Sequence, residues 1–142
     1  MFLNRLPAPV ITRLVGWWQQ WEHFIFGVWE QVSGENVGEA YLANADWHVP
    51  RLELGYFILQ EHTGKGYTTE AARALVNFAF QQLEVERLEL QCQADNLASQ
   101  KVAGRCGFTF EGRLRQHHRK KDGRLVDVLW YGLLRSEWHN QT

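Results

Sequence analysis

Residues 51–93 read RLELGYFILQEHTGKGYTTEAARALVNFAFQQLEVERLELQCQ, and this stretch decides the fold. Its first ten residues predict a strand over 51–60, and alternating apolar and polar residues predict a second strand over 87–93. Helical spacing between them predicts a helix from Tyr67 or Thr68 to Leu83. The residues that share its apolar face are Ala72, Leu75, Val76, Ala79 and Leu83. A strand, a helix and a strand in this order predict a right-handed crossover, which places 51–60 parallel to 87–93.

The flanking segments supply the remaining elements. We expect a Trp-rich helix over about 9–22, whose aromatic residues belong to the core or to a dimer surface. We further expect a hairpin of strands 24–32 and 37–44, a short helix capped by Asp95-Asn96 and ending at Gly107, and a last hairpin of strands 108–121 and 124–134 around Asp122-Gly123. This order predicts an α/β fold of the α+β, three-layer kind, with a mixed sheet in a single domain over residues 1–142.

Length and composition exclude several classes of protein. The chain has 142 residues, 45% of them hydrophobic and 22% charged, with a net charge of -1, which excludes a disordered chain and disfavours a generic nucleic-acid-binding domain. Two cysteines, Cys92 and Cys106, are too few for a disulfide scaffold and too isolated for a metal site. Because no apolar stretch approaches the roughly 20 residues that span a bilayer, we expect a cytoplasmic protein with no metal, no membrane contact and no direct nucleic-acid partner.

The loop between the predicted strand and helix is rich in glycine. Gly64 and Gly66 permit tight backbone geometry and the close approach of a ligand, and the amides of a helix N-terminus bind anions. Since Lys65 adds a positive charge, we interpret the loop as a pyrophosphate cradle, although a Gly-x-Gly pair alone also fits an ordinary strand-to-helix turn. It is not a Walker A loop, because Leu59 occupies the first glycine position, nor a dinucleotide fingerprint, because Thr69 occupies the third.

Several motifs follow one another along the chain. They are Gly55-Tyr56-Phe57-Ile58, Gly64-Lys-Gly-Tyr-Thr-Thr-Glu-Ala-Ala72, Asp95-Asn96-x-x-Ser99-x-Lys101-Val102, Gly107-Phe108-x-x-Glu111-Gly112 and Asp127-Val-x-x-Tyr131-Gly-Leu-Leu-Arg-Ser-Glu-Trp138. With these motifs in order over residues 24–138, the sequence resembles the GNAT superfamily of acetyl-CoA-dependent N-acetyltransferases, and within it the RimJ/RimL-type branch. The resemblance implies a mostly antiparallel sheet with a central splayed parallel strand pair flanked by helices, and acetyl-CoA as the co-substrate.

The resemblance also implies roles for individual residues. Backbone groups of Phe57, Ile58 and Leu59 would pair with the pantetheine arm, and a backbone N–H of this strand would polarise the thioester carbonyl. Asn96 would hydrogen-bond the pantetheine or the reacting region, and Ser99 would donate a proton near the CoA sulfur. These two are the predicted catalytic residues. The loop residues that would bind the pyrophosphate are His62, Thr63, Gly64, Lys65, Gly66, Tyr67 and Thr68.

Three positions depart from the family pattern. Ala103 stands where many members carry a Tyr that protonates the leaving thiolate. Ser99 or Tyr131 would substitute for it, or the thiolate would leave unaided, since a thiol has a pKa of about 8.5. Gln91 stands where some relatives carry a Glu as the general base, and Glu61 replaces the first basic or amide residue of the loop.

No residue of the sequence stands out as the general base. Glu39, His117, His118 and a water molecule are the candidates, although a His pair on a hairpin is more often one solvated and one packed residue. We interpret Asp127 as structural, held by hydrogen bonds inside the last hairpin. The basic run over 113–121 is interpreted as a solvated face of that hairpin rather than an RNA contact.

The sequence therefore predicts direct transfer of an acetyl group from acetyl-CoA to a primary amine, either a protein N-terminal α-amine or a small-molecule amine. Deprotonation near neutral pH costs under about 1 kcal/mol for an α-amine and roughly 4 kcal/mol for a lysine, so a missing base favours an α-amine. The alternative is a non-catalytic acyl-CoA-binding or regulatory module, which Ala103 and the short N-terminal region favour. From that short region we also expect the part of the domain that binds the acceptor to be abbreviated, or to be completed by a second subunit of a homodimer.

Overall fold

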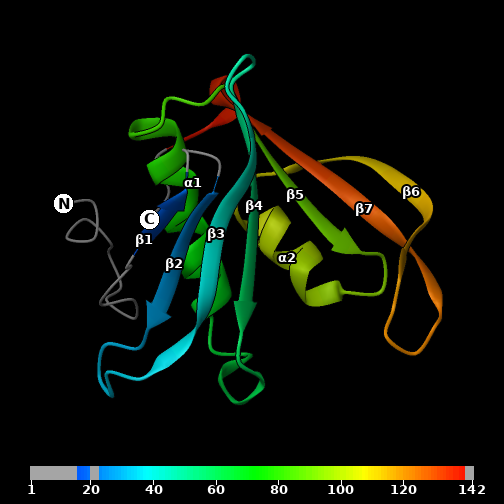
Figure 1. Ribbon diagram of the computed structural model, residues 1–142, viewed down its shortest axis with the longest axis horizontal. Helices are drawn as coiled ribbons and strands as arrows, with labels where there is room; N and C mark the ends of the chain where they lie inside the picture. Colours follow the sequence, from blue (N-terminus) through cyan, green and yellow to red (C-terminus); the bar gives the residue numbers. More distant parts are fainter. Residues whose placement is uncertain (1–15, 20–22, 140–142) are drawn as a thin grey trace.

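The computed structural model describes residues 16–19 and 23–139, and its centre is a seven-stranded sheet (Figure 1). The strand order is β1-β2-β3-β4-β5-β7-β6, and every neighbouring pair is antiparallel except β4 and β5. The elements are β1 (Gly16–Gln19), β2 (His23–Trp29), β3 (Asn36–Asp46), β4 (Arg51–Ile58), the 3-10 turn η2 (Gln60–His62), α1 (Tyr67–Gln81), β5 (Arg87–Gln93), α2 (Leu97–Arg105), β6 (Thr109–Arg119), β7 (Leu125–Leu134) and the 3-10 turn η3 (Arg135–Glu137). The predicted α/β class with a mixed sheet is confirmed.

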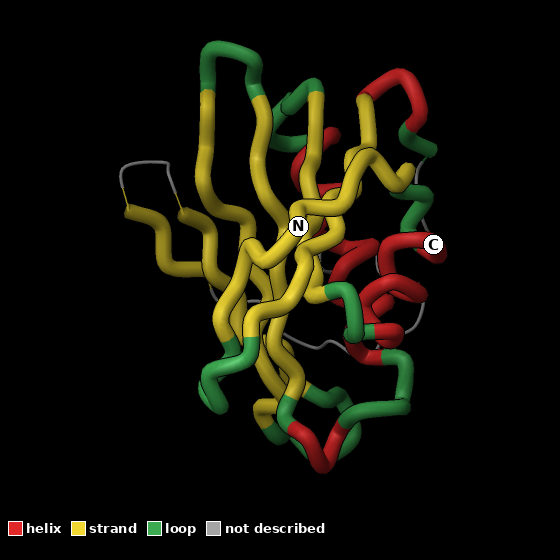
Figure 2. Tube along the Cα trace, turned by 90° about the vertical axis from the view of Figure 1, so that its right-hand side faces the viewer, coloured by secondary structure: helices red, strands yellow, loops and turns green. Residues whose placement is uncertain are grey.

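Both α-helices of the described part lie on the same face of the sheet (Figure 2). They contact each other directly, and the Arg73 guanidinium of α1 donates a hydrogen bond to the Arg105 carbonyl at the end of α2, at 3.2 Å. Alternation along the strands explains this arrangement, because it gives the sheet one apolar face. Leu52 and Leu54 on β4 and Leu88 on β5 are buried on this face. Burial of one such side chain stabilises the fold by roughly 1.5–3 kcal/mol.

The predicted parallel pair is present, and it is short. β4 and β5 are in register from Arg51 beside Arg87 to Leu54 beside Leu90, and no pairing follows within these two strands. The helix between them has the expected apolar stripe, with Leu75 buried at its centre. The central strands therefore diverge at Leu54, as the resemblance implied.

The prediction of an N-terminal helix over about 9–22 is wrong for residues 16–19. These residues form β1, which pairs antiparallel with β2 from Gly16 beside Phe26 to Gln19 beside His23. The spacing of the tryptophans fits a helix, but aromatic residues also favour strands, and pairing with β2 decides between the two. The rest of that predicted helix lies outside the described residues.

Several element ends also differ from expectation by one to three residues. β2 ends at Trp29, three residues early, and β4 ends at Ile58, after which Gln60–His62 forms a 3-10 turn.

Within the described ranges, no helix is long and apolar enough to cross a membrane.

Candidate active site

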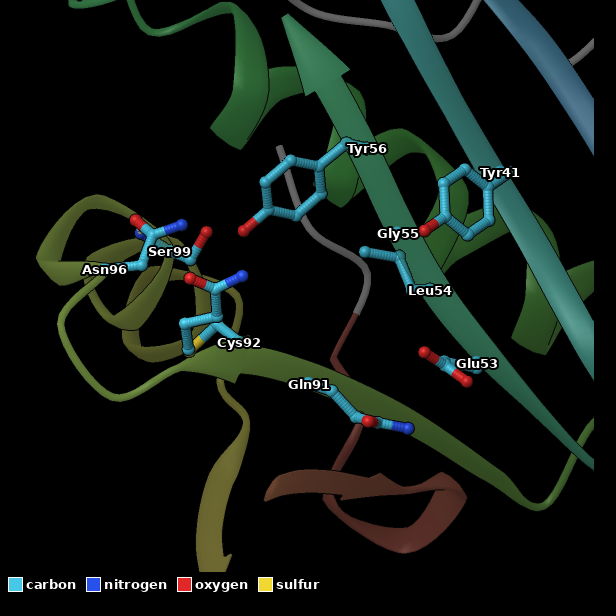
Figure 3. Close-up of a pocket in the computed structure, with 10 residues that line it drawn as sticks. Tyr41, Glu53, Leu54, Gly55, Tyr56, Gln91, Cys92, Asn96 and Ser99 are labelled. Atoms are coloured by element: carbon cyan, nitrogen blue, oxygen red, sulfur yellow. Dashed lines mark hydrogen bonds between the residues drawn. The ribbon is translucent and has the colours of Figure 1, made fainter. Parts of the chain in front are cut away.

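A cavity of about 290 Å³ opens where β4 and β5 diverge, and the first turn of α2 closes one side of it (Figure 3). Its walls come from β3, β4, β5 and α2. The lining residues are Tyr41, Glu53, Leu54, Gly55, Tyr56, Gln91, Cys92, Gln93, Asn96 and Ser99. Of the predicted site residues, Asn96 and Ser99 are brought together here.

Strand alternation divides this cavity into two sides. Tyr56 follows Leu54 toward the helix face, where it meets Ser99. Glu53 lies on the opposite face of β4, next to Tyr41 of β3. A hydroxyl pair therefore lies on one side of the gap and a carboxylate on the other.

Gly55 is required by the packing of Tyr41. A Cβ atom at position 55 would overlap the ring of Tyr41. The Tyr41 ring therefore lies directly over the Gly55 backbone, and burial raises the pKa of its hydroxyl. This packing forms the wall of the cavity on the Glu53 side.

The Tyr56 hydroxyl is buried beside the cavity. Burial raises the pKa of Tyr56 to about 12, an effect that the nearby Ser99 hydroxyl partly opposes. Although the two hydroxyls point toward each other (Figure 3), Tyr56 Oη has no hydrogen-bond partner of acceptable geometry among the described residues. A buried hydroxyl without a partner is energetically unfavourable, which makes this position unusual.

Asn96 has a structural role as the predicted cap of α2. Its Oδ1 accepts a hydrogen bond from the Ser99 amide at 3.1 Å, so the cap is confirmed. This bond orients Asn96 and Ser99 relative to each other. The Asn96 side-chain amide retains its N–H donors on the cavity side.

The glycine-rich loop ends in the N-terminus of α1. Gly64 and Gly66 have φ values of +80° and +82°, and a Cβ at either position would meet nothing within 4 Å. They are therefore needed for their backbone conformation, and the space beside them is open. Gly66 is the N-cap and supplies no side-chain cap, so the first-turn amides of α1 are available to an anion. Lys65 lies over the Tyr67 ring, 5.9 Å from its centroid.

Two contacts hold this loop against the β2–β3 turn. The Tyr67 hydroxyl donates a hydrogen bond to the Glu30 carboxylate, and this bond lowers the pKa of Glu30. His62 lies 3.8 Å from the Glu35 carboxylate. Thr63 closes the 3-10 turn with a hydrogen bond from its hydroxyl to the Gln60 carbonyl at 2.8 Å. The loop backbone is therefore ordered by its own side chains.

The hydrogen bonds between β4 and β3 limit which backbone groups of β4 could pair with pantetheine. The Leu59 amide donates to the Val37 carbonyl of the β3 side at 2.9 Å, so this amide is already occupied. Antiparallel alternation then directs the backbone groups of Phe57 toward β3 as well, and those of Tyr56 and Ile58 toward the gap. Phe57 instead presents a side chain that is 60% exposed.

The three side chains expected as bases do not line the cavity. Glu39 is exposed on β3, and His117 and His118 are exposed on β6, where His117 packs against Trp130 with ring centroids 6.5 Å apart. Among the described residues, Glu53 is the carboxylate side chain that lines the cavity. Its Oε2 accepts a hydrogen bond from the Asn44 side chain at 2.6 Å.

Sequence reasoning missed Glu53 and Tyr56 as site residues. Their positions in the strand carried a signal, because residues 53 and 56 are separated by an odd number and so face opposite sides of β4. The point at which β4 leaves β5 could not be read from that pattern.

Two structural interpretations of the last hairpin agree with the geometry. Asp127 accepts hydrogen bonds from Arg113 Nε at 2.6 Å and from the Gln116 amide at 2.8 Å, and these bonds lower its pKa. The basic run on β6 is exposed, and Lys120 pairs with Asp95 at 2.5 Å.

In the described ranges, no group of three or more His, Cys, Asp or Glu residues could hold a metal ion.

Comparison with known proteins identifies the family. Residues 7–109 match the acetyltransferase (GNAT) domain family. The chain belongs to the GNAT family. A solved GNAT-fold neighbour described as "Probable acetyltransferase" superposes with a TM-score of 0.77 at 33% identity, covering 82% of this chain and 64% of its own.

Curated relatives are named N-acetyltransferases, and the ribosomal names among them support the RimJ/RimL-type branch, including the "Ribosomal-protein-serine acetyltransferase" of Escherichia coli, which is 39% identical over 45% of this chain and 36% of its own length. The "Uncharacterized N-acetyltransferase p20" of Bacillus licheniformis is 32% identical over 80% of this chain and 63% of its own length. The "Putative ribosomal N-acetyltransferase YdaF" of Bacillus subtilis is 35% identical over 77% of this chain and 59% of its own length. The chain therefore spans less than two thirds of each of these relatives.

The contact between Gly55 and Tyr41 gives a direct test of the cavity wall. We expect Gly55→Ala to lower the free energy of unfolding by about 1–3 kcal/mol, because the added Cβ overpacks the wall. Thermal unfolding measures the loss, and Tyr41→Ser in the same background should recover much of it by removing the ring. Gly104→Ala is the matched control, since its Cβ would meet nothing within 4 Å. An unchanged melting temperature for Gly55→Ala would contradict this packing.

Proposed function

We propose that this protein transfers an acetyl group from acetyl-CoA to a primary amine by direct attack within a ternary complex. The observation that carries the proposal is the cavity between the diverging strands, which brings Asn96 and Ser99 to one side and Glu53 to the other. Membership of the GNAT family supports acetyl-CoA as the co-substrate. A single domain over residues 1–142 and a homodimer remain predictions.

The residues on the helix side fit acetyl-CoA, which supplies an activated acyl group when bound. The open first-turn amides of α1 and the loop from His62 to Thr68 would hold the diphosphate. The backbone of Tyr56 and Ile58 would pair with the pantetheine arm, and one of their amides would donate to the thioester carbonyl oxygen. Asn96 would donate a hydrogen bond to the pantetheine arm, and Ser99 would donate a hydrogen bond to the sulfur.

The Glu53 side of the cavity fits an amine. A carboxylate attracts an ammonium group, and Glu53 would accept its proton, directly or through a water molecule, before the amine attacks. This proton transfer is easier from an α-amine than from a lysine, by roughly 3 kcal/mol near neutral pH. The name of the Bacillus subtilis relative also supports a protein acceptor. We therefore place an N-terminal α-amine before a small-molecule amine.

The second candidate function is a non-catalytic acyl-CoA-binding module. Ala103 is fully buried in the core beneath α2, so this helix position supplies no hydroxyl to a leaving thiolate. Such a module would bind CoA and release no thiol.

The activity assay separates these functions. We expect free thiol to be released from acetyl-CoA in a saturable, amine-dependent reaction. The acceptors are a peptide with a free α-amine, the same peptide blocked at its N-terminus with an internal lysine, and a polyamine. Faster reaction of the α-amine peptide supports the acceptor class, whereas faster reaction of the lysine peptide overturns it. CoA binding without turnover of any acceptor would establish the non-catalytic module.

Variants of Asn96 separate its cap from its contact with the co-substrate. Asn96→Asp keeps the cap oxygen and loses the N–H donors, so we expect unchanged thermal stability and CoA affinity reduced by about tenfold in calorimetry. Asn96→Ala should lose about 1 kcal/mol of stability in addition. Equal CoA affinity in the parent and Asn96→Asp would remove Asn96 from the binding site.

Glu53 is tested against Glu39, a carboxylate that does not line the cavity. We expect Glu53→Gln to lower kcat/KM for the amine by about 10²–10⁴-fold, which is the range for loss of a general base. Acetyl-CoA binding should be unchanged, and Glu39→Gln should retain activity. Loss of activity in Glu39→Gln with full activity in Glu53→Gln would reverse the assignment.

A further inference from the structure

The Tyr56 hydroxyl is buried beside the cavity without a hydrogen-bond partner among the residues that the structure describes. It points from β4 toward Ser99 at the first turn of α2 (Figure 3). Removing an unpartnered hydroxyl would not weaken the fold, so packing alone gives no reason for a tyrosine here instead of a phenylalanine. The position therefore suggests a partner that is engaged only when the site is loaded.

The surroundings of Tyr56 keep its hydroxyl neutral. The titratable groups that interact electrostatically with it are Cys92 on β5, Cys106 at the end of α2 and, from the other face of β4, Tyr41 on β3, and burial raises the pKa of each of them. Glu53 lines the same cavity from the opposite face of β4. With its own pKa raised to about 12, Tyr56 remains a hydrogen-bond donor throughout the working range of pH.

We propose that Tyr56 is a positioning residue for Ser99: its hydroxyl donates to Ser99 Oγ and thereby turns the Ser99 O–H toward the CoA sulfur. This inference rests on the proposed function, and it deepens it. Such bonds are often long in an unloaded site and tighten when substrate is bound. A hydroxyl that accepts one hydrogen bond also becomes a stronger donor in the next.

The step involves no proton transfer from Tyr56. As the amine nitrogen forms its C–N bond to the acyl carbon and its surplus proton passes to solvent, the C–S bond breaks and its electron pair stays on sulfur. Ser99 donates a hydrogen bond to that sulfur while Tyr56 donates a hydrogen bond to Ser99. The thiol of free cysteine has a pKa of about 8.5, so a phenol with a pKa of about 12 is too weak an acid to protonate the thiolate outright. The hydroxyl pair instead stabilises the negative charge on sulfur, which is the contribution that Ala103 cannot make from α2.

The test is the pKa of the CoA thiol bound to the full chain. It is followed by the ultraviolet absorbance of the thiolate between about pH 6 and 10, with the desulfo-CoA complex of each variant as the blank. We expect Tyr56→Phe to raise the pKa of the bound thiol by about half a unit to one unit, and Ser99→Ala to raise it by one to two units. Tyr131, the other hydroxyl that the sequence offered as a donor to the thiolate, lies outside the cavity, edge-on against Phe110, so Tyr131→Phe should leave this pKa unchanged and serves as the control.

The double variant decides whether Tyr56 acts through Ser99. In the Ser99→Ala background, we expect Tyr56→Phe to cause no further shift. A shift that persists there, or a Tyr56→Phe protein whose bound thiol has the parent pKa, overturns the proposal. Thermal unfolding accompanies the titration, and Tyr56→Phe should be at least as stable as the parent. Absence of CoA binding by the parent would refute the proposed function itself, so the two failures are distinguishable.

Discussion

Everything at the candidate site depends on two parallel strands that start as neighbours and then separate. β4 and β5 are paired through Leu54 and Leu90, and beyond that point each is held by its outer neighbour. β4 remains bound to β3 through the Leu59 amide, and β5 remains paired with β7 as far as Gln93. The inner backbone groups of β4 are therefore left without a strand partner. Buried backbone groups need hydrogen bonds, so this gap requires an extended ligand or water to complete it.

The gap also explains how one strand can serve both partners of a transfer reaction. Successive residues of β4 face opposite sides of the sheet, so Glu53 and Tyr56 come from the same strand but do not share an environment. Tyr56 lies among neutral groups beneath the helices, while Glu53 accepts a hydrogen bond from Asn44 on the more open face. A single main-chain element thus places a carboxylate and a hydroxyl pair on opposite faces of the sheet.

Local patterns predicted much of this structure. The strand–helix–strand unit, the apolar stripe around Leu75 and the cap at Asn96 follow from periodicity and from short-range hydrogen bonding, and all three are present. Local patterns did not predict the strand at 16–19. The spacing of its aromatic residues suits both a helix and a strand, and only pairing with β2 decides between them. Local patterns could not predict the cavity either, since Glu53 and Ser99 are far apart in the sequence and line one cavity only because β4 diverges from β5.

The position of β7 in the sheet has a consequence for biosynthesis. β7 lies between β5 and β6, although it follows both in the chain. While the polypeptide is being made, β5 therefore has an open edge until residue 134 has been synthesised. Unpaired edges promote association with other chains. A nascent chain arrested within the last hairpin would expose such an edge at the centre of the nascent fold, so completion of the C-terminal strand protects the protein from aggregation as well as shaping its sheet.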